Sequence, residues 1–242
     1  MGWSAWTEDL TSVESWLAWA GQSQDSGQAG GQAGRGWVQP NDLPMMLRRR
    51  ATMVGRKALG AAISLPAVEN ARYILSSRYG ELDRTASILS SLVEKEPVSP
   101  ADFSMSVHHG LVGLLSIALK NTRGHGAVAG GAESFCYGLL EAASCLASRP
   151  DEPVVLIHYD ECPESAFATQ IDAPAGLGAV VAALCLSAPT AGEGLAMTIE
   201  SRKRDDGPST DSHVLDFLRF ILTDAASSAS RGNRLSWEWS RA

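Results

Sequence analysis

The sequence lacks the features that mark several large classes of protein. Its 20 basic residues are outnumbered by 27 acidic ones, giving a formal net charge of -7. It therefore has no basic excess of the kind that nucleic-acid-binding proteins use to hold phosphates. The longest apolar run, residues 176–188, is about 13 residues long, whereas a membrane-spanning helix needs roughly 20. We expect no nucleic-acid partner and no membrane span.

Cysteine is scarce, and its spacing is uninformative for metal binding. Cys136, Cys145, Cys162 and Cys185 form no Cys-x-x-Cys pair and no cluster with histidine at metal-ligand spacing. The opening residues, MGWSAWTEDL, have neither the basic start nor the apolar stretch of a signal peptide. These features predict free thiols in a reducing cytoplasm, with no metal and no other cofactor.

The hydrophobic pattern alternates between strand-like and helix-like segments. Strands are predicted at 72–77, 127–131, 154–159, 179–186, 195–201 and 235–239, and helices at 12–20, 44–63, 81–93, 104–119, 134–147 and 214–226. The turn residues at 189–192 predict that 179–186 and 195–201 pair as an antiparallel hairpin, and 235–239 is predicted as an edge strand. Strands separated by helices indicate an α/β fold with a mostly parallel sheet.

One low-complexity segment interrupts this pattern. Residues 21–36, GQSQDSGQAGGQAGRG, contain no apolar periodicity and predict a flexible surface insertion. Patterned sequence lies on both sides of it, so it does not mark a domain boundary. A chain of 242 residues can bury one sizeable core. We therefore expect a single domain over residues 1–242.

Residues 99–146 resemble the central half of the condensing enzymes. Residues 113–117, Gly-Leu-Leu-Ser-Ile, are similar to the end of the β-ketoacyl synthase helix that precedes a small-residue strand, and residues 130–138 are similar to the elbow that carries the nucleophilic cysteine. The segments SAWTEDL, PMMLRRR, SSRYGELDRT and YDE resemble the short ketoacyl-synthase-like proteins of aryl polyene and xanthomonadin-type clusters. The resemblance implies half of a thiolase-like fold, with a mixed, mostly parallel sheet flanked by helices.

The chain departs from this family at the positions of the catalytic residues. The nucleophile position falls at Glu133, Ser134 or Phe135, and none of these is cysteine. The family also uses two histidines from a C-terminal half, to polarise the thioester and assist decarboxylation. The chain stops before such a half, and no His-Gly-Thr follows Val154. The resemblance therefore implies a silent, chain-length-factor-like partner that forms a heterodimer with a full-length β-ketoacyl synthase in polyene or fatty-acid-type acyl chain elongation.

A second hypothesis is a stand-alone acyltransferase or condensing-type enzyme using Cys136 or Ser134. A thiolate at Cys136 would be stabilised by the start of the following helix. Ser134 lacks a Gly-x-Ser-x-Gly context and is better suited to capping that helix. A third hypothesis is an α/β scaffold without acyl chemistry.

In the resembling fold, two subunits pair through the strands that run into their elbows. Small residues there would allow the close approach of the partner. The resemblance places candidates for the interface and for the wall of the partner's acyl tunnel at Phe103, Met105, His108, His109, Leu111, Ala129, Gly130, Phe135 and Tyr137.

Two further groups have a functional and a plain interpretation. The basic residues Arg48, Arg49, Arg50, Arg56 and Lys57 would steer an acidic acyl carrier protein, or simply form a solvated helix face. Asp160 and Glu161 follow a strand end, where α/β enzymes often place catalytic groups. A solvated strand-to-loop transition is the simpler expectation for this pair.

Overall fold

The structure is a computed structural model that describes residues 2–22, 35–36, 43–161, 178–189 and 195–242. The predicted insertion at 21–36 lies almost entirely outside the described residues, as do Cys162 and most of the turn at 189–192. Cys136, Cys145 and Cys185 are free thiols. None of the described helices is long and apolar enough to cross a membrane.

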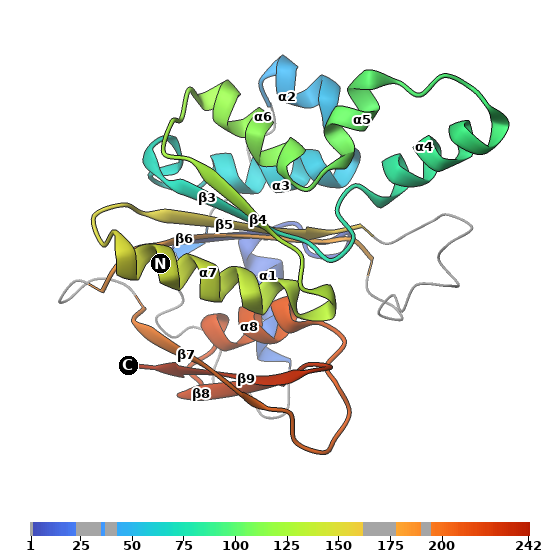
Figure 1. Cartoon of the computed structure of the whole chain (residues 1–242). Coiled ribbons are helices and arrows are strands. Elements are labelled where there is room, and N and C mark those ends of the chain that lie inside the picture. The colour runs from blue at the N-terminus through green and yellow to red at the C-terminus, as the bar shows by residue number, and fades with distance from the viewer. Residues whose placement is uncertain (1, 23–34, 37–42, 162–177, 190–194) are drawn as a thin grey trace.

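A six-stranded sheet forms the centre of the molecule (Figure 1). Its strands, in spatial order, are β2 (Arg35–Gly36), β1 (Gly2–Trp6), β6 (Val180–Leu186), β5 (Val154–Asp160), β3 (Arg72–Ser76) and β4 (His125–Val128). The β1–β2, β3–β4 and β3–β5 pairs are parallel, and the two pairs that involve β6 are antiparallel. The sheet is therefore mixed and mostly parallel, as predicted.

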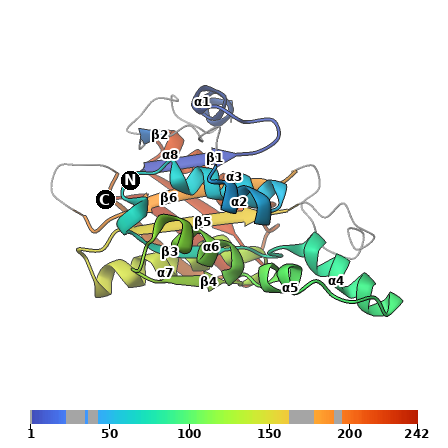
Figure 2. The same ribbon diagram turned by 90° about the horizontal axis from the view of Figure 1, so that it is seen from above.

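Helices cover both faces of this sheet, and a second sheet lies beyond one of them (Figures 1 and 2). One helical layer contains α2 (Met45–Arg50), α3 (Met53–Ile63), α4 (Leu82–Glu94), α5 (Pro100–Ser106) and α6 (His109–Leu119). The other contains α1 (Val13–Gly21), α7 (Ser134–Ser148) and α8 (His213–Leu222). Beneath it lies a three-stranded antiparallel sheet, in the order β7 (Met197–Lys203), β9 (Leu235–Arg241) and β8 (Ser227–Arg231).

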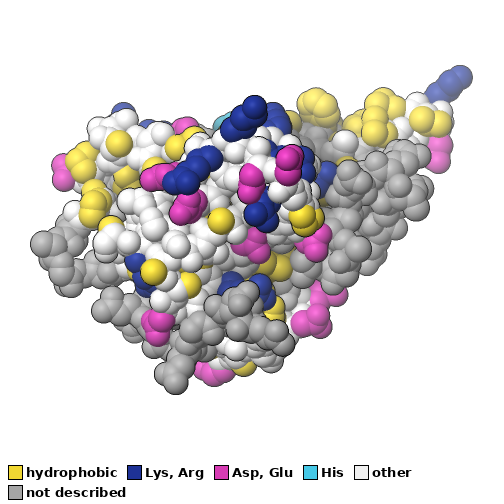
Figure 3. All heavy atoms as spheres, turned by 90° about the horizontal axis from the view of Figure 1, so that it is seen from below, with side chains coloured by type: hydrophobic (Ala, Val, Ile, Leu, Met, Phe, Trp, Pro, Cys, Tyr) yellow, Lys and Arg dark blue, Asp and Glu magenta, His cyan; other side chains and the backbone are white. Residues whose placement is uncertain are grey.

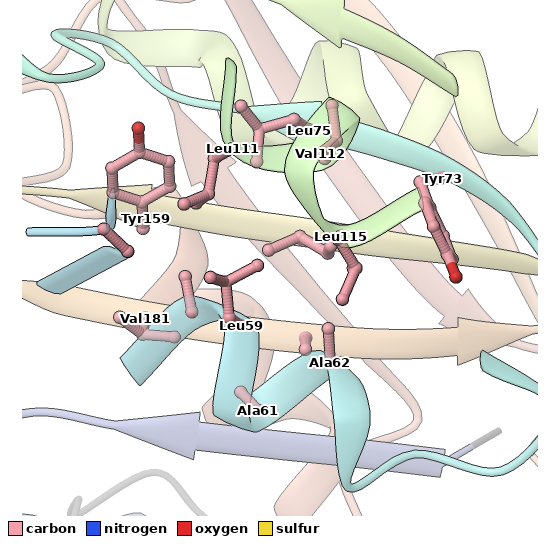
Figure 4. Close-up of a cluster of buried hydrophobic side chains, with 14 of the residues drawn as sticks. Leu59, Ala61, Ala62, Tyr73, Leu75, Leu111, Val112, Leu115, Tyr159 and Val181 are labelled. Atoms are coloured by element: carbon pink, nitrogen blue, oxygen red, sulfur yellow. The ribbon is translucent and has the colours of Figure 1, made fainter. Parts of the chain in front are cut away.

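Side chains of the central strands alternate between two hydrophobic cores, because successive residues of a strand point to opposite faces. Tyr73 and Tyr159 face the core shared with α3 and α6, which includes Leu59 and Leu115 (Figure 4). Ile74, Leu156 and Ala182 face the core shared with α7, α8 and the second sheet. The central strands are thus buried on both sides, as expected for a sheet between two helical layers.

Two of the predicted helices are each divided into two. In the predicted helix 44–63, Ala51 is extended and Thr52 caps α3 by accepting a hydrogen bond from the Gly55 N–H at 3.1 Å. The prediction of one helix was wrong because a threonine side chain can satisfy backbone donors better as a cap than inside a helix. The predicted helix 104–119 breaks at Val107, which is also extended and separates α5 from α6.

The predicted hairpin between 179–186 and 195–201 was also wrong. β6 pairs with β1 and β5, whereas β7 pairs with β9 in the other sheet. β9 is a central strand and not the predicted edge strand, and β1 and β8 were not predicted. Local alternation indicates a strand but does not identify its partner, and β1 lies far from β6 in the sequence.

Candidate functional site at the strand-to-helix elbow

The chain turns sharply from β4 into α7, at the position where the sequence predicted the elbow. A short 3-10 turn covers residues 131–133, and Gly131 has a left-handed backbone with φ of 68°. A Cβ atom on Gly130 would lie 2.4 Å from the ring of Tyr137. The Tyr137 ring in turn meets Trp237 edge-on, with centroids 5.2 Å apart. A glycine is required at position 130 because this aromatic ring packs across the turn.

Glu133 is bound to the second sheet. Its side chain is buried, and its Oε1 accepts hydrogen bonds from the N–H groups of Arg234 at 2.6 Å and Leu235 at 3.2 Å. Arg234 lies in the turn between β8 and β9, and Leu235 is the first residue of β9. A Cβ atom on Gly232 would lie 2.4 Å from the same oxygen, so a glycine is needed there too. The carboxylate therefore links the elbow to the C-terminal strands.

Ser134 is bonded within the elbow itself. Its hydroxyl accepts a hydrogen bond from the Gly130 N–H at 2.9 Å and donates one to the Gly131 carbonyl at 2.7 Å. The side chain is buried, and its proton is held by a backbone carbonyl and not by a base. Ser134 is the first residue of α7 and stabilises the turn before it. The N-cap position, predicted at Ser134 or a neighbour, is occupied by the neighbour Glu133, whose side chain makes no capping hydrogen bond.

Phe135 and Cys136 point into the interior. Phe135 packs edge-on against His158 and also contacts Phe217, with centroid distances of 5.3 Å in both cases. Cys136 is fully buried, and this burial raises the pKa of its thiol well above the usual range; Glu133 and Asp216 raise it further. Since the thiolate is the nucleophilic form of cysteine, Cys136 is a protonated, inaccessible thiol in this structure.

Two buried histidines that were not among the sequence candidates lie in the same core region. His158 Nδ1 is 3.0 Å from Ser76 Oγ, and His213 Nδ1 is 2.7 Å from Ser230 Oγ. Burial lowers the pKa of both imidazoles. Position 158 lies within the aliphatic run of β5, so the sequence pattern indicated a core strand there and gave no sign of a functional histidine.

Asp160 organises the turn that follows β3. Its Oδ1 accepts hydrogen bonds from the Ser77 hydroxyl at 2.8 Å and from the N–H groups of Arg78 at 2.7 Å and Tyr79 at 3.2 Å. These bonds connect the carboxyl ends of the parallel strands β3 and β5. The expectation of a simply solvated transition was wrong for Asp160, because its carboxylate is satisfied by a neighbouring turn.

Glu161 and Glu81 form a buried acidic pair around Thr52. The Thr52 hydroxyl lies 2.7 Å from Glu161 Oε1 and 3.5 Å from Glu81 Oε1, and Tyr159 donates a hydrogen bond to Glu81 at 3.1 Å. Burial raises the pKa of both carboxyl groups, that of Glu161 to about 7. The expectation of a solvated Glu161 was therefore wrong as well.

The strand that leads into the elbow has a free edge. β4 pairs with β3 on one side, where the Gly124 and Val128 carbonyls accept hydrogen bonds from Tyr73 and Ser77. Because the bonding direction alternates along a strand, the N–H and C=O groups of residues 125, 127 and 129 point away from β3. No strand in the described part of the chain covers this outer edge.

The predicted interface residues do not all reach the surface. Met105, Leu111 and Phe135 are buried in the two cores and are not available at the surface of this chain. His108 is half-buried beside Gly80, whereas Phe103, His109 and Ala129 are exposed. Ala129, Gly130 and Tyr137 line a hollow of about 450 Å³ beside the elbow.

The basic residues predicted to steer a carrier protein lie together on α2 and α3. Arg48, Arg49, Arg50 and Arg56 are exposed to solvent, and Lys57 lies over the Trp6 ring at 5.1 Å. Four of the five cations are therefore accessible on this face.

A mixed sheet between helical layers, with a strand that runs into a closed elbow, defines a protein built as half of a thiolase-like fold. Comparison with family models matches the N-terminal domain of β-ketoacyl synthases over residues 16–240. The chain belongs to this family.

Among solved structures, the chain is similar to one from Xenorhabdus doucetiae that contains the ketosynthase ApeO in complex with its chain length factor ApeC. The identity is 27% and the TM-score 0.81, over 99% of this chain and 97% of the matched one. The ishigamide ketosynthase/chain length factor shares the fold at 16% identity and a TM-score of 0.57, over 83% of this chain and 66% of that one. No curated protein sequence matched.

We predict that Glu133→Ala destabilises the protein by about 2–3 kcal/mol, since it removes the acceptor of two backbone donors in a buried place. Urea unfolding would measure this change. Glu133→Gln, which keeps one oxygen in place, is the control and is expected to lose less. Equal stabilities of wild type and Glu133→Ala would contradict the structural role of this carboxylate.

The raised pKa of Glu161 predicts that folding stability falls as the pH rises. The folded protein holds a proton that the unfolded chain releases near pH 4.5, so stability is lost between that pH and about 7. The loss attributable to Glu161 is on the order of 3 kcal/mol. Urea unfolding at pH 5 and pH 8 would measure it, and Glu161→Gln should flatten the dependence. An equally steep dependence in that variant would contradict this assignment.

Proposed function

We propose that this chain is the non-catalytic, chain-length-factor-like partner of a full-length β-ketoacyl synthase, and that the pair elongates a polyene or fatty-acid-type acyl chain carried by an acyl carrier protein. The observation that carries this proposal is the closed elbow. Glu133 and Ser134 are bonded to backbone groups, Phe135 is packed in the core, and Cys136 is buried and protonated. The alternative of an enzyme that uses Cys136 or Ser134 receives no support from this geometry.

The similarity to the Xenorhabdus complex supports a place for this chain in a pair made of a ketosynthase and a chain length factor. That complex is described as a ketosynthase with its chain length factor, and its matched chain is covered almost completely by this one.

The free edge of β4 is the surface where we expect the ketosynthase to bind. Unpaired N–H and C=O groups on a sheet edge are ready to bond with another strand. The side chains of Gly126, Ala127 and Ala129 are small and would let that strand approach. Next to this edge is the hollow at Tyr137, and we propose that the residues lining it shape the partner's acyl tunnel.

The exposed arginines of α2 and α3 fit a secondary role in the proposed complex. Acyl carrier proteins are acidic, and a cluster of accessible cations accelerates the encounter of oppositely charged partners. Arg48, Arg49 and Arg50 follow one another at the end of a short helix, which concentrates this charge. We propose them as a contact for the carrier protein that delivers the acyl chain.

The strand-edge proposal predicts that Ala127→Pro prevents assembly with a full-length ketosynthase from the same organism. Proline removes the outward N–H of residue 127, while the bonds between β4 and β3 use the neighbouring residues. Co-expression followed by size-exclusion chromatography would show the loss of the complex. Circular dichroism of the isolated variant is the control for folding. A folded Ala127→Pro variant that still forms the wild-type complex would overturn this interface.

The silent role predicts that Cys136→Ala leaves elongation unchanged, because the Cys136 thiol takes no part in the chemistry. A carrier-protein elongation assay on the purified complex would measure the rate. The same substitution at the ketosynthase's own nucleophilic cysteine should abolish turnover. Loss of activity in an intact complex that carries only Cys136→Ala would instead favour the enzyme hypothesis.

A further inference from the structure

Helix α4 has an apolar face that nothing in the described structure covers. None of its residues is buried, and Leu89, Leu92 and Val93 are 48%, 58% and 82% exposed. These three residues lie on one side of the helix, since positions three and four apart are neighbours on a helical surface. The opposite side carries polar residues, among them Ser87 and Glu94. An amphipathic helix of this kind usually faces a hydrophobic surface.

Among the described residues, the side-chain bonds that hold α4 to the body of the protein are made near its beginning. Arg84 pairs with Glu81 at 3.4 Å and with Asp102 of α5, and it donates a hydrogen bond to the Arg50 carbonyl at 3.0 Å. Beyond this anchor the helix projects from the molecule as an arm (Figure 1). Helices of about 13 residues are only marginally stable alone in water. Burial of the exposed Leu89, Leu92 and Val93 side chains against another surface would stabilise this helix.

The arm lies on the same side of the molecule as the free edge of β4. Viewed from above, α4, α5, α6 and β4 follow one another along one side, opposite to α1 (Figure 2). Three more apolar side chains of this helical layer are exposed. Phe103 in α5 is 63% exposed, Val107 just after α5 is 50% exposed, and Ile117 on α6 is 69% exposed. From below, hydrophobic side chains gather on the projecting arm, whereas charges of both signs occupy the middle of the view (Figure 3). Exposed apolar side chains are therefore present on α6, on and after α5, and on the arm.

We propose that α4 is a docking arm whose Leu89–Leu92–Val93 face binds an apolar surface of the ketosynthase subunit. This inference rests on the proposed function, because a strand paired with β4 would place its own subunit alongside the arm. The interface would then extend beyond the strand edge and beyond the interface residues predicted from the sequence. Burying large aliphatic side chains is the main favourable contribution to such contacts.

Hydrogen exchange tests where the arm is covered. In the isolated chain, the amides of residues 82–94 should exchange much faster than those of α7, because the arm has no buried residue. In the complex with the ketosynthase they should become protected. If they are equally protected in the isolated chain, another part of this chain or a second copy covers the arm, and the proposal is wrong.

A pair of matched variants tests the binding energy. The triple variant Leu89→Gln, Leu92→Gln and Val93→Gln should raise the dissociation constant for the ketosynthase at least tenfold, while circular dichroism shows an unchanged fold. The control Ser87→Gln alters the opposite face and should bind like wild type. If wild type binds and the triple variant binds equally well, the arm proposal fails and the proposed function stands. If wild type itself forms no complex with the ketosynthase, both proposals fail.

Discussion

The arrangement of the elbow depends on one buried carboxylate. Glu133 leaves the turn between β4 and α7 and accepts the backbone N–H groups of Arg234 and Leu235, about a hundred residues further along the chain. A charged or strongly polar group in the interior needs such partners, because burial removes it from water. The bond joins the six-stranded sheet to the three-stranded one. The Glu133 side chain also occupies the space at the start of α7, where a condensing enzyme presents its nucleophile.

The closed elbow and the free edge of β4 lie within a few residues of each other, and their side chains and backbone groups point in different directions. The side chains of residues 133–136 turn inwards, where the bonds of Ser134 and the packing of Phe135 hold them. The backbone of β4, only a few residues earlier, turns its unpaired groups outwards. The elbow therefore presents no accessible nucleophile to a substrate, whereas the edge of β4 presents unpaired N–H and C=O groups to another strand. This contrast underlies the proposed division of labour between a silent subunit and an active one.

Local sequence patterns predicted most of the elements but not their pairing. The aliphatic run of β5 and the periodicity of α7 each indicate their structure from a few residues, whereas the elbow was placed by the resemblance of residues 130–138 to the condensing enzymes. The partners of β6, the central position of β9 and the role of Glu133 depend on contacts between distant parts of the chain. The acidic pair was missed for the same reason, since Thr52 and Glu161 meet only in the folded protein.

The central claim is that acyl chemistry takes place on the partner and not on this chain. Intact-mass spectrometry of the assembled complex, after incubation with an acylated carrier protein, would locate the acyl group directly. We predict an acyl adduct on the ketosynthase subunit alone, with this chain at its unmodified mass. An acyl group bound covalently to this chain, and lost on replacement of Cys136 or Ser134, would contradict the account.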